Sequence, residues 1–481
     1  MRNINLYGFI TLFGILFLII LYKVFNLPVV TDESPTVFFY SNFSFWDIMM
    51  YPDNIPNNHI LNTLLSKCSM IIFGKEQWAI RLPNLLCFIA FGFSVFRILK
   101  LLLTTSSYFF LPAAILFINP YWLDFFGLGR GYGISSTMVT ISVGFMLEAY
   151  MFKKTRFIWY ALITSILASY ANFSVLVFWV AVTTMVAFYF FIENKKDLRK
   201  VIKPYIIITL ISLAYLALII VPIIKMQSTN QFQYWTSMGF YEETIKSLLR
   251  DWWYDSNILS KIGLDYWAGA LAIIVLINII IFLKHLRKNK FSLQCFSQPT
   301  FVTTAILILP AFISIVQSTV LKTPNLNGRT ALFFFPLVSS VFATSLSLIP
   351  ELKKQWIIKS LAVSAGIILV MNLTSRVSLK SVREWSYDQN TLQVMNYINE
   401  KYEGKPISLK TSWFFHPSFY FYSYTGKSPY IDLQDFDYNI DITTRSEYYY
   451  IFAEDYKLLE PRFEVVYKFS PDRWLLKQRI R

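Results

Sequence analysis

The chain has 481 residues, of which 55% are hydrophobic, 18% aromatic and only 15% charged. Such a composition excludes an ordinary water-soluble globular protein, in which about a quarter of the residues are charged. The formal net charge is +15, but residues 376–481 are nearly balanced, with 15 Lys and Arg against 14 Asp and Glu. The excess therefore lies among the hydrophobic segments, where it orients the chain and meets anionic lipid, and it is not a nucleic-acid signal.

Long apolar runs recur along the chain, and a run of about 20 residues can cross about 30 Å of hydrocarbon as a helix. A β-barrel would show short alternating segments instead. The pattern predicts a polytopic α-helical membrane protein with about eleven transmembrane helices, at 7–25, 83–103, 107–122, 132–152, 157–171, 173–192, 203–225, 266–284, 301–321, 331–349 and 356–374.

The first run, 7–25, is longer than the apolar part of a cleaved signal peptide, and no small-x-small site follows it. We interpret it as a retained signal anchor. Lys and Arg cluster in alternate loops, at 97–100, 153–156, 195–200, 284–290 and 353–359. The positive-inside rule places these loops in the cytoplasm, so the amino terminus is expected inside and the carboxyl terminus outside, as an odd helix count requires.

Three parts are expected to face outward, namely the loop 26–82, the loop 226–265 and the tail 376–481. In the tail, helical periodicity runs through TLQVMNYINEKY. The segments PISLK, YYYIFA and FEVVYKF have the composition of short strands. We therefore predict a transmembrane domain at 1–375 and a small extracytoplasmic α/β domain at 376–481.

Asp32 and Glu33 lie where the first helix is expected to leave the membrane on its outer side. An ionised carboxylate at a bilayer edge is costly unless it is solvated or paired, so this position suggests a site. Partial burial and a like-charged neighbour would each raise a carboxylate pKa and improve the group as a base. The alternative is an ordinary helix end in water.

Farther along the same loop, Leu61, Leu64, Leu65 and Cys68 share one face of a predicted helix. This spacing favours an amphipathic helix that lies in the membrane interface. Cys68 and the two other cysteines, Cys87 and Cys295, are far apart in the chain and fit neither a disulfide framework nor a zinc site.

Polar residues flank that helix. Asn57, Asn58 and His59 stand at its start, where backbone N–H groups have no helical partner, and His59 is the only histidine in an outward loop before the tail. Arg81 precedes the second span and could hold a phosphate or extend toward water at the helix end.

Two later outward segments each carry one arginine of interest, Arg130 in GLGRGYG and Arg329 in PNLNGRTALFFFP. Glycine permits close backbone approach, and arginine suits bidentate phosphate binding. The glycine spacing is not that of a dinucleotide-binding loop. For each arginine, an anchoring charge at a helix end is the alternative. Together with Asp32, Glu33 and His59, however, they are expected on one side at similar depth, which fits chemistry on a lipid-linked phosphate.

These segments resemble the GT-C glycosyltransferases, the class that contains protein O-mannosyltransferases and the aminoarabinose transferases of lipid A. The resemblance covers residues 1–375 and is closest to bacterial members with a compact outer domain. Five features occur in the order typical of the class: the Asp-Glu pair after the first helix, the amphipathic segment, the WAIRLPNLL entry to the second span, RGY before a later helix, and GR…P near the end.

The resemblance implies an enzyme of the bacterial inner membrane that takes a sugar from a polyprenyl-phosphate donor and passes it to an extracytoplasmic glycan, lipid or protein. Asp32 receives the role of base in an inverting single displacement, with Glu33 in support. Arg130, Arg329 and Tyr132 receive the role of binding the donor phosphate.

The remaining polar residues, Asn57, Asn58, His59 and Arg81, are candidates for binding the acceptor or another part of the substrate. Many relatives have His-Pro-Pro or Pro-Pro-Leu in the first loop, where this chain has Asn57-Asn58-His59-Ile60-Leu61. That departure argues against a protein mannosyltransferase and leaves the acceptor class open. A bound divalent metal would need further ligands beside the acidic pair, so neither metal nor cofactor is predicted.

Three alternatives remain at this stage. A flippase or transporter of lipid-linked sugars would carry charges at mid-membrane, which most spans lack. A polysaccharide polymerase or ligase would use the same donors and differ in the size of its product. A scaffold that works through its tail would give no reason for the acidic pair, the arginines and His59 to recur on one side.

Overall fold

The computed structural model describes residues 3–103, 109–195, 197–228, 238–254, 263–290, 292–349 and 356–479. The chain divides into two compact units. The first, which we call the helical unit, comprises Met1–Leu21, Phe45–Asn62 and Pro83–Val377. The second, which we call the sheet unit, comprises Tyr22–Ser44, Thr63–Leu82 and Ser378–Arg481.

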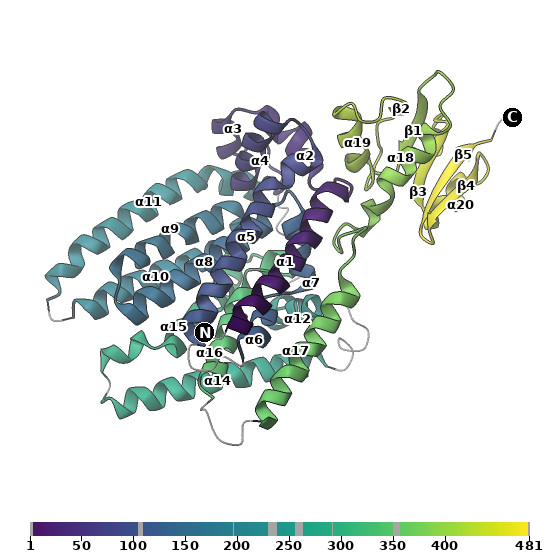
Figure 1. The fold of residues 1–481 in the computed structure, drawn as a ribbon. Helices are drawn as coiled ribbons and strands as arrows, with labels where there is room; N and C mark the ends of the chain where they lie inside the picture. The colour runs from purple at the N-terminus through teal and green to yellow at the C-terminus, as the bar shows by residue number, and fades with distance from the viewer. Residues whose placement is uncertain are drawn as a thin grey trace. The chain divides into compact units, whose positions relative to one another are not determined.

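Most of the helical unit consists of long apolar helices (Figure 1). Helices α1 (Asn3–Asn26), α4 (Ile60–Phe73) and α5 (Gln77–Leu102) have parts in both units. The other α-helices of this unit are α3 (Phe45–Met49), α6 (Phe110–Leu116), α7 (Pro120–Asp124), α8 (Gly131–Phe152), α9 (Thr155–Ala171), α10 (Leu176–Glu193), α11 (Arg199–Gln227), α12 (Lys246–Trp252), α14 (Leu264–Lys288), α15 (Pro299–Leu321), α16 (Phe334–Ser347) and α17 (Trp356–Arg376).

Every segment predicted to span the membrane contains helix, which confirms the polytopic helical architecture. Among the described residues, seven helices are long and apolar enough to cross a bilayer, or eight if the pair α6 and α7 counts as one span. This pair falls in the predicted span 107–122 and is bent by 64°. The bend follows from Asn119, whose extended backbone and side-chain oxygen cap α7 just before Pro120. The count of eleven stays a prediction.

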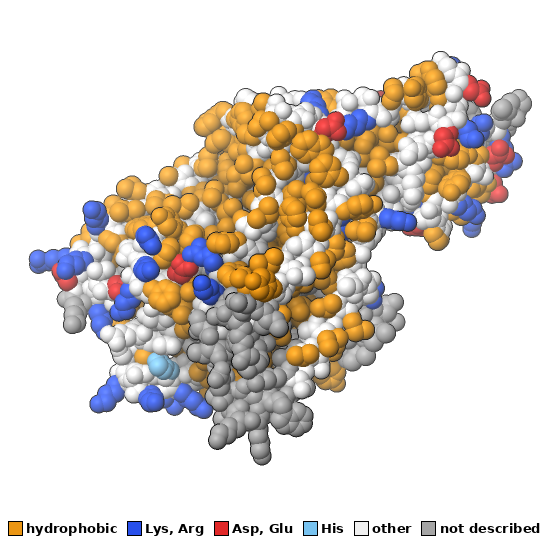
Figure 2. Space-filling model, in the orientation of Figure 1, with side chains coloured by type: hydrophobic (Ala, Val, Ile, Leu, Met, Phe, Trp, Pro, Cys, Tyr) orange, Lys and Arg blue, Asp and Glu red, His pale blue; other side chains and the backbone are white. Residues whose placement is uncertain are grey.

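Basic side chains collect at one end of the helical unit, over the ends of α10, α11, α14 and α15 (Figure 2). Arg97 pairs with Glu148, and Lys153 Nζ lies 3.7 Å from Glu193 Oε1, so the last turns of α5, α8 and α10 meet at the same level. Hydrophobic side chains cover the lengths of these helices in the same view. The arrangement is that of an integral membrane protein, with charged loops beyond its apolar helices.

The described tail folds into a five-stranded sheet with the order β2-β1-β3-β5-β4 (Figure 1). Strand β1 (Ile407–Thr411) pairs in parallel with β2 (Ile431–Leu433) and β3 (Tyr448–Phe452), with Leu409 opposite Leu433 and Tyr448. Strand β5 (Arg473–Gln478) is antiparallel to both β3 and β4 (Phe463–Ser470). The predicted small α/β region is confirmed, with the expected helix at α18 (Thr391–Asn399) and the expected strands at β1, β3 and β4. The other α-helices of the sheet unit are α2 (Ser34–Phe38), α19 (His416–Tyr424) and α20 (Tyr456–Leu459).

The core of the sheet unit combines the tail with residues from the first loop. Val29, Val37 and Ile80 are buried in one cluster with Leu409 and Tyr450. The segments around the acidic pair therefore belong to the same hydrophobic core as the sheet.

Helix α4 (Ile60–Phe73) forms in the segment predicted to be an amphipathic helix, and its position in the membrane interface stays a prediction. Three of its polar residues, Asn62, Ser66 and Ser69, are each at most 7% exposed. The apolar residues Leu65 and Ile72 are exposed. This inverted pattern is the one expected of a helix whose apolar face meets lipid.

Candidate active site

Glu33 of the acidic pair is completely buried in the sheet unit, just before α2. Its two carboxylate oxygens accept from Arg81, with Nε 2.9 Å from Oε1 and Nη2 2.7 Å from Oε2. The backbone N–H of Val30 also donates to Oε2, at 3.0 Å. The pair has the parallel two-bond geometry that makes arginine–carboxylate contacts strong and directional.

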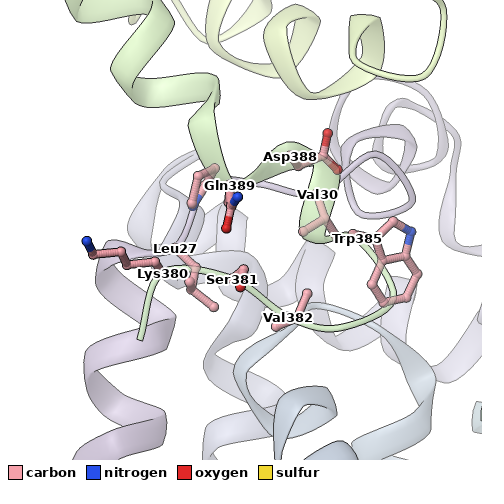
Figure 3. Close-up of a pocket in the computed structure, with 9 residues that line it drawn as sticks. Leu27, Val30, Lys380, Ser381, Val382, Trp385, Asp388 and Gln389 are labelled. Carbon is pink, nitrogen blue, oxygen red and sulfur yellow. The ribbon is translucent and has the colours of Figure 1, made fainter. Parts of the chain in front are cut away.

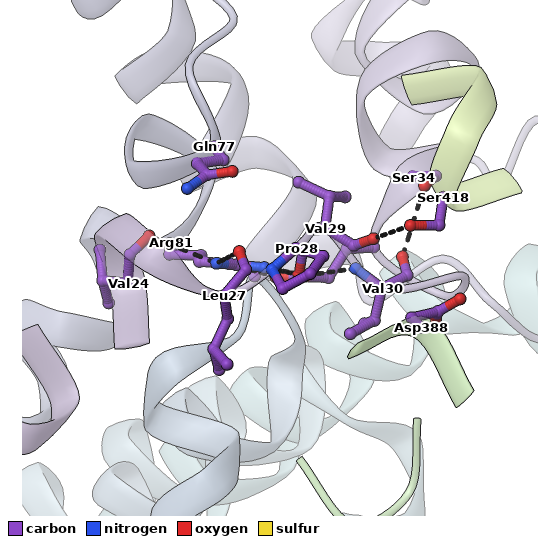
Figure 4. Close-up of polar contacts among 12 residues, drawn as sticks. Val24, Leu27, Pro28, Val29, Val30, Ser34, Gln77, Arg81, Asp388 and Ser418 are labelled. Atoms are coloured by element: carbon purple, nitrogen blue, oxygen red, sulfur yellow. Dashed lines mark hydrogen bonds and ion pairs between the residues drawn. The ribbon is translucent and has the colours of Figure 1, made fainter. Parts of the chain in front are cut away.

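Arg81 also closes the end of the first helix (Figure 4). Nη1 donates to the carbonyls of Lys23, Val24 and Leu27, at 3.3, 3.3 and 2.9 Å, and Nη2 donates to Pro28 O at 2.8 Å. The last carbonyls of a helix have no N–H partner within the helix, and here the guanidinium group of Arg81 donates hydrogen bonds to them. All three guanidinium nitrogens of Arg81 thus form hydrogen bonds within the sheet unit. Arg81 therefore fixes the position of the acidic pair.

Asp32 is half-buried between Thr31 and Glu33, and its neighbour Thr31 is held by the tail. The Thr31 N–H donates to Asp388 Oδ2 at 2.7 Å, and its hydroxyl lies 3.2 Å from Asp388 Oδ1. The same hydroxyl lies 2.7 Å from Phe414 O. The backbone on one side of Asp32 is therefore fixed by Asp388, and the backbone on the other side by Arg81 through Glu33.

Asp388 was not singled out from the sequence, because it lies 357 positions from Thr31 and no local motif marks it. The side chain is 1% exposed. Burial raises the pKa of Asp388 well above its usual range, and the charges of Asp32 and Glu33 raise it further, while the two bonds from Thr31 act in the opposite direction. This carboxyl therefore resists ionisation at a point adjacent to the acidic pair.

A small pocket lies beside these groups, between the residues that follow α1 and the start of the tail (Figure 3). Its volume is about 10 Å³, which is room for one water molecule and not for a sugar. The lining residues are Leu27, Pro28, Val30, Lys380, Ser381, Val382, Trp385, Asp388 and Gln389.

The second part of the candidate site lies in the helical unit, around His59. Nδ1 of His59 lies 3.1 Å from the carbonyl oxygen of Ala171, at the end of α9. Since a carbonyl only accepts, Nδ1 carries the proton, and Nε2 is then an acceptor. Nε2 is buried and has no hydrogen-bond partner in the part of the chain that the structure describes.

Gly131 makes this contact possible. A Cβ at Gly131 would lie 2.8 Å from His59 Nδ1 and closer still to Ala171 O. The ring of His59 also packs against the edge of Tyr132, with 4.7 Å between ring centroids. Because Gly131 has no side chain, the His59 ring and the Ala171 carbonyl can both lie against its backbone.

Both arginines predicted from the sequence affect the pKa of His59. Burial lowers the pKa of His59 well below its usual value, and the charge of Arg130 and then that of Arg329 lower it further, against the effect of the Ala171 carbonyl. Both guanidinium groups therefore act on the same imidazole, and the ring is neutral at physiological pH.

Arg130 is 2% exposed and occupies the position just before α8. Its Nη1 donates to Asn57 O at 3.1 Å, and Asn58 Nδ2 donates to Ile48 O at 3.2 Å. The N-terminus of a helix carries free N–H groups and partial positive charge, so α8 and Arg130 together form a surrounding suited to an anion.

Asparagine side chains hold the GLGRGYG segment in place. Asn62 Nδ2 donates to Gly129 O at 2.7 Å, and Asn84 Nδ2 donates to Asn62 Oδ1 at 2.9 Å. Asn84 belongs to the RLPNLL segment. The two hydrogen bonds therefore bring three of the sequence motifs into contact, at α4, at α5 and just before α8.

Arg329 lies in the short helix η7 (Gly328–Ala331) and is half-buried. Gly328 has a φ of 50°, and its N–H donates to Ser247 Oγ at 3.1 Å. Glu243 Oε2 accepts from both Asn325 N and Asn325 Nδ2, at 3.1 and 2.9 Å. The loop that carries Arg329 is therefore attached to the helical segment 241–252.

Two further residues near Arg130 were missed from the sequence. Tyr51 is 1% exposed and has a left-handed φ of 62°. Burial raises its pKa, and Arg130 opposes that rise, which places the phenol near the guanidinium. Lys225 Nζ donates to the carbonyls of Met50 and Tyr51, at 3.1 and 2.6 Å. No periodicity or motif marks either residue.

The structure thus groups the predicted residues in two places. Asp32, Glu33 and Arg81 lie in the sheet unit, and the others, Asn57, Asn58, His59, Arg130, Tyr132 and Arg329, lie in the helical unit. That all of them serve one site stays a prediction. Within the described residues, no group of three His, Cys, Asp or Glu side chains is arranged to hold a metal ion, and metal independence likewise remains a prediction.

No protein-family model matches this chain, and no curated protein matches its sequence. Among solved structures, it is similar to ArnT from Cupriavidus metallidurans bound to undecaprenyl phosphate, with 9% identity, a TM-score of 0.47 and coverage of 98% of each chain. It is also similar to the Archaeoglobus fulgidus oligosaccharyltransferase in the apo form, with 12% identity, a TM-score of 0.45, and coverage of 94% of this chain and 71% of that one. Both likenesses extend over nearly the whole of this chain.

Proposed function

We propose that this protein is a membrane glycosyltransferase that passes a sugar from a polyprenyl-phosphate donor to an extracytoplasmic acceptor. The observation that carries the proposal is the acidic pair directly after the first apolar helix, in which Arg81 fixes Glu33 and leaves Asp32 half-buried beside it. A carboxylate fixed at the end of a membrane helix is placed to meet a donor at headgroup level and an acceptor from water.

In the proposed reaction, Asp32 takes the proton from an acceptor hydroxyl as its oxygen attacks the anomeric carbon. The bond between that carbon and the phosphate oxygen breaks, and the polyprenyl phosphate departs with the electron pair. A single displacement inverts the anomeric configuration. Arg81 and Glu33 position Asp32, because the guanidinium nitrogens of Arg81 and the carboxylate oxygens of Glu33 are already engaged with each other and with the backbone.

The helical unit would bind the leaving phosphate. Arg130 at the start of α8, together with Arg329, would stabilise the charge that develops on the phosphate oxygens. The buried Nε2 of neutral His59 would accept a hydrogen bond from a sugar hydroxyl, and Tyr132 holds the imidazole ring in place. Asn57 and Asn58 would act by holding the loop that meets Arg130.

The test is transfer of radiolabelled sugar from synthetic polyprenyl-phosphate sugars by the full chain in nanodiscs, with a lipid and glycan extract as the source of acceptor. Removing a general base costs about 10²- to 10⁴-fold in rate, so Asp32→Asn is expected to lose that much activity. The matched control is Asp47→Asn, which neutralises an exposed carboxylate of the same loop.

Equal transfer by wild type and Asp32→Asn, with equal thermal stability, would remove Asp32 as the base. Donor binding without transfer by the wild type would favour a flippase of lipid-linked sugars. A labelled product of many sugars, instead of one, would favour a polymerase or ligase.

A further inference from the structure

Four aromatic side chains of the tail form a group at the surface of the sheet unit, and we call it the aromatic shelf. Trp413 lies 3.8 Å from Phe414 and 5.6 Å from Tyr438, and Tyr438 lies 5.6 Å from Phe436, between ring centroids. Tyr438 is 75% exposed, Phe414 38% and Phe436 37%. The shelf joins the residues that follow β1 to the loop that follows β2.

The shelf lies at the edge of the core. Phe414 packs against Phe452 and Tyr387, with 6.0 and 5.7 Å between ring centroids, and is still 38% exposed. Its sequence neighbour Phe415 is completely buried against Tyr450 and Phe452. Contiguous aromatic side chains at a protein surface mark an interaction site. Rings with two rotatable side-chain bonds lose little entropy on binding, so they are efficient contact surfaces.

Charge distinguishes among the possible occupants of the shelf. Residues 430–443 contain four aspartates, Asp432, Asp435, Asp437 and Asp441, and no Lys or Arg. Lys410 Nζ lies 2.9 Å from Asp437 Oδ2 and 2.9 Å from Asp441 Oδ2, yet Asp437 remains 61% exposed. Carboxylates at this edge would repel anionic phospholipid headgroups, which argues against a membrane anchor.

The same chemistry suits a sugar. Each pyranose ring has a face of C–H groups, whose partial positive charge complements the negative face of an aromatic ring. Its hydroxyl groups donate to carboxylates, which only accept when ionised. Exposed rings bordered by carboxylates therefore fit a glycan that carries no phosphate or carboxylate of its own.

The shelf is also continuous with the acidic pair inside the sheet unit. The Thr31 hydroxyl lies 2.7 Å from Phe414 O, and Thr31 directly precedes Asp32. We propose that the aromatic shelf binds the acceptor, that this acceptor is a glycan without acidic groups, and that the shelf presents its reactive hydroxyl to Asp32. This inference rests on the proposed function and specifies its acceptor class.

The experiment uses the full chain in nanodiscs and three probes, the β-1,4-linked tetramers of glucose, N-acetylglucosamine and glucosamine. Binding is measured by saturation-transfer-difference NMR. We expect the wild type to bind at least one tetramer, and Trp413→Ala and Tyr438→Ala to weaken that binding at least tenfold. The matched control, Tyr467→Ala, removes a tyrosine of the same unit that is 48% exposed on β4, and is expected to change binding less than twofold.

The inference is overturned if the wild type binds none of the three tetramers, or if the shelf variants and Tyr467→Ala bind them equally. It is also overturned if brominated phospholipid quenches the fluorescence difference between wild type and Trp413→Phe, because Trp413 would then lie in the bilayer. Matching thermal unfolding midpoints show that the shelf variants remain folded.

Donor cleavage by water separates this inference from the proposed function. Donor cleavage is measured in the same nanodiscs of the wild type that are used for glycan binding. Shelf-dependent glycan binding by a wild type that cleaves no donor would refute the transferase and retain the glycan site. Donor cleavage by a wild type that binds no glycan would retain the transferase and refute the glycan site.

Discussion

Arg81 organises the acidic pair at the scale of single residues, because it joins Glu33 to four backbone carbonyls of residues 23–28. Nothing in the sequence indicated this. A lone arginine before an apolar helix suggests a phosphate ligand or an anchoring charge, and only the three-dimensional contacts show that its donors are used within the protein. The sequence indicated Asp32 and Glu33 as a candidate site, whereas the support of Glu33 by Arg81 became visible only in the structure.

Arg81→Ala is expected to lower the free energy of unfolding by about 3–5 kcal/mol, because it leaves the Glu33 carboxylate buried without its partner. Arg81→Lys should also destabilise the protein, since one ammonium cannot replace the two-bond geometry. Unfolding in mixed micelles measures both effects. The control is Lys427→Ala, which breaks an exposed pair with Glu76 and should cost less than about 1 kcal/mol. Equal losses for Arg81→Ala and the control would contradict this account.

Asp388 gives the protein a pH dependence with a definite sign. Its pKa in the folded state is raised, so the folded state keeps a proton that the unfolded chain releases above about pH 4. Stability from this group is therefore complete below pH 4 and declines as the pH rises toward the folded pKa. The charges of Asp32 and Glu33 add to the effect, and burial keeps the phenols of Tyr422 and Tyr450 neutral. Lys380 lines the same small pocket as Asp388.

Asp388→Asn should therefore be more stable than the wild type at pH 8, and the difference should vanish near pH 4. Asparagine stays neutral, and its side-chain oxygen can still accept from the Thr31 N–H. Thermal unfolding at the two pH values measures the difference. Asp472→Asn is the control, since Asp472 is an exposed carboxyl of the same unit and its pKa is lowered, not raised. A pH-independent difference for Asp388→Asn would show that its ionisation is not involved.

At the scale of elements, the start of α8 depends on the absence of a side chain at Gly131. Gly131→Ala would place a Cβ against Ala171 O and His59, so we expect lower stability and a transfer rate reduced at least tenfold. Gly144→Ala lies in the same helix and meets only Ile98, at 3.5 Å. An alanine in a helix interior is favoured by about 1 kcal/mol over glycine, so this control should be neutral or stabilising. Thermal unfolding and radiolabel transfer check both variants, and similar behaviour of the two would refute the close-packing argument.

Helices were more predictable than strands, for a physical reason. Apolar runs such as 203–225 correspond to single long helices because the bilayer imposes their length. Strand β2 has only three residues, and β5 reads RWLLKQ, so neither has the alternating pattern by which a strand is recognised. The break between α6 and α7 could have been found, since Asn119-Pro120 inside a predicted span is a capping residue followed by a helix-starting proline.

At the scale of the whole molecule, the composition and the order of motifs were sufficient to predict a helical membrane protein with a small tail sheet. The division into units was less accessible. Val29 and Ile80 share a core with Leu409, although more than 300 residues separate them from it. Contacts between segments so distant in the chain leave no periodicity, and a single sequence gives no other signal. For the same reason the sequence indicated Asp32 and Glu33 but not Asp388.

The proposed orientation in the membrane can be tested with single cysteines in a chain from which Cys68, Cys87 and Cys295 have been removed. The variant Glu460→Cys in the tail should react with a membrane-impermeant maleimide in intact cells. The variant Lys154→Cys, in the basic loop between α8 and α9, should react only after the cells are opened. Both positions are exposed in the structure, so access to the reagent depends on sidedness alone. The opposite labelling pattern would place the tail in the cytoplasm.

The ion pair between Arg81 and Glu33 also has a consequence for the synthesis and membrane insertion of the protein. The two residues are 48 positions apart, and the arginine belongs to the second long helix. While the ribosome has made only the first helix, Glu33 has no cation to meet and must remain hydrated at the membrane surface. The acidic pair therefore acquires its final form only when the second helix has been synthesised and inserted, so a nascent chain that ends before residue 81 holds both carboxylates but no assembled site.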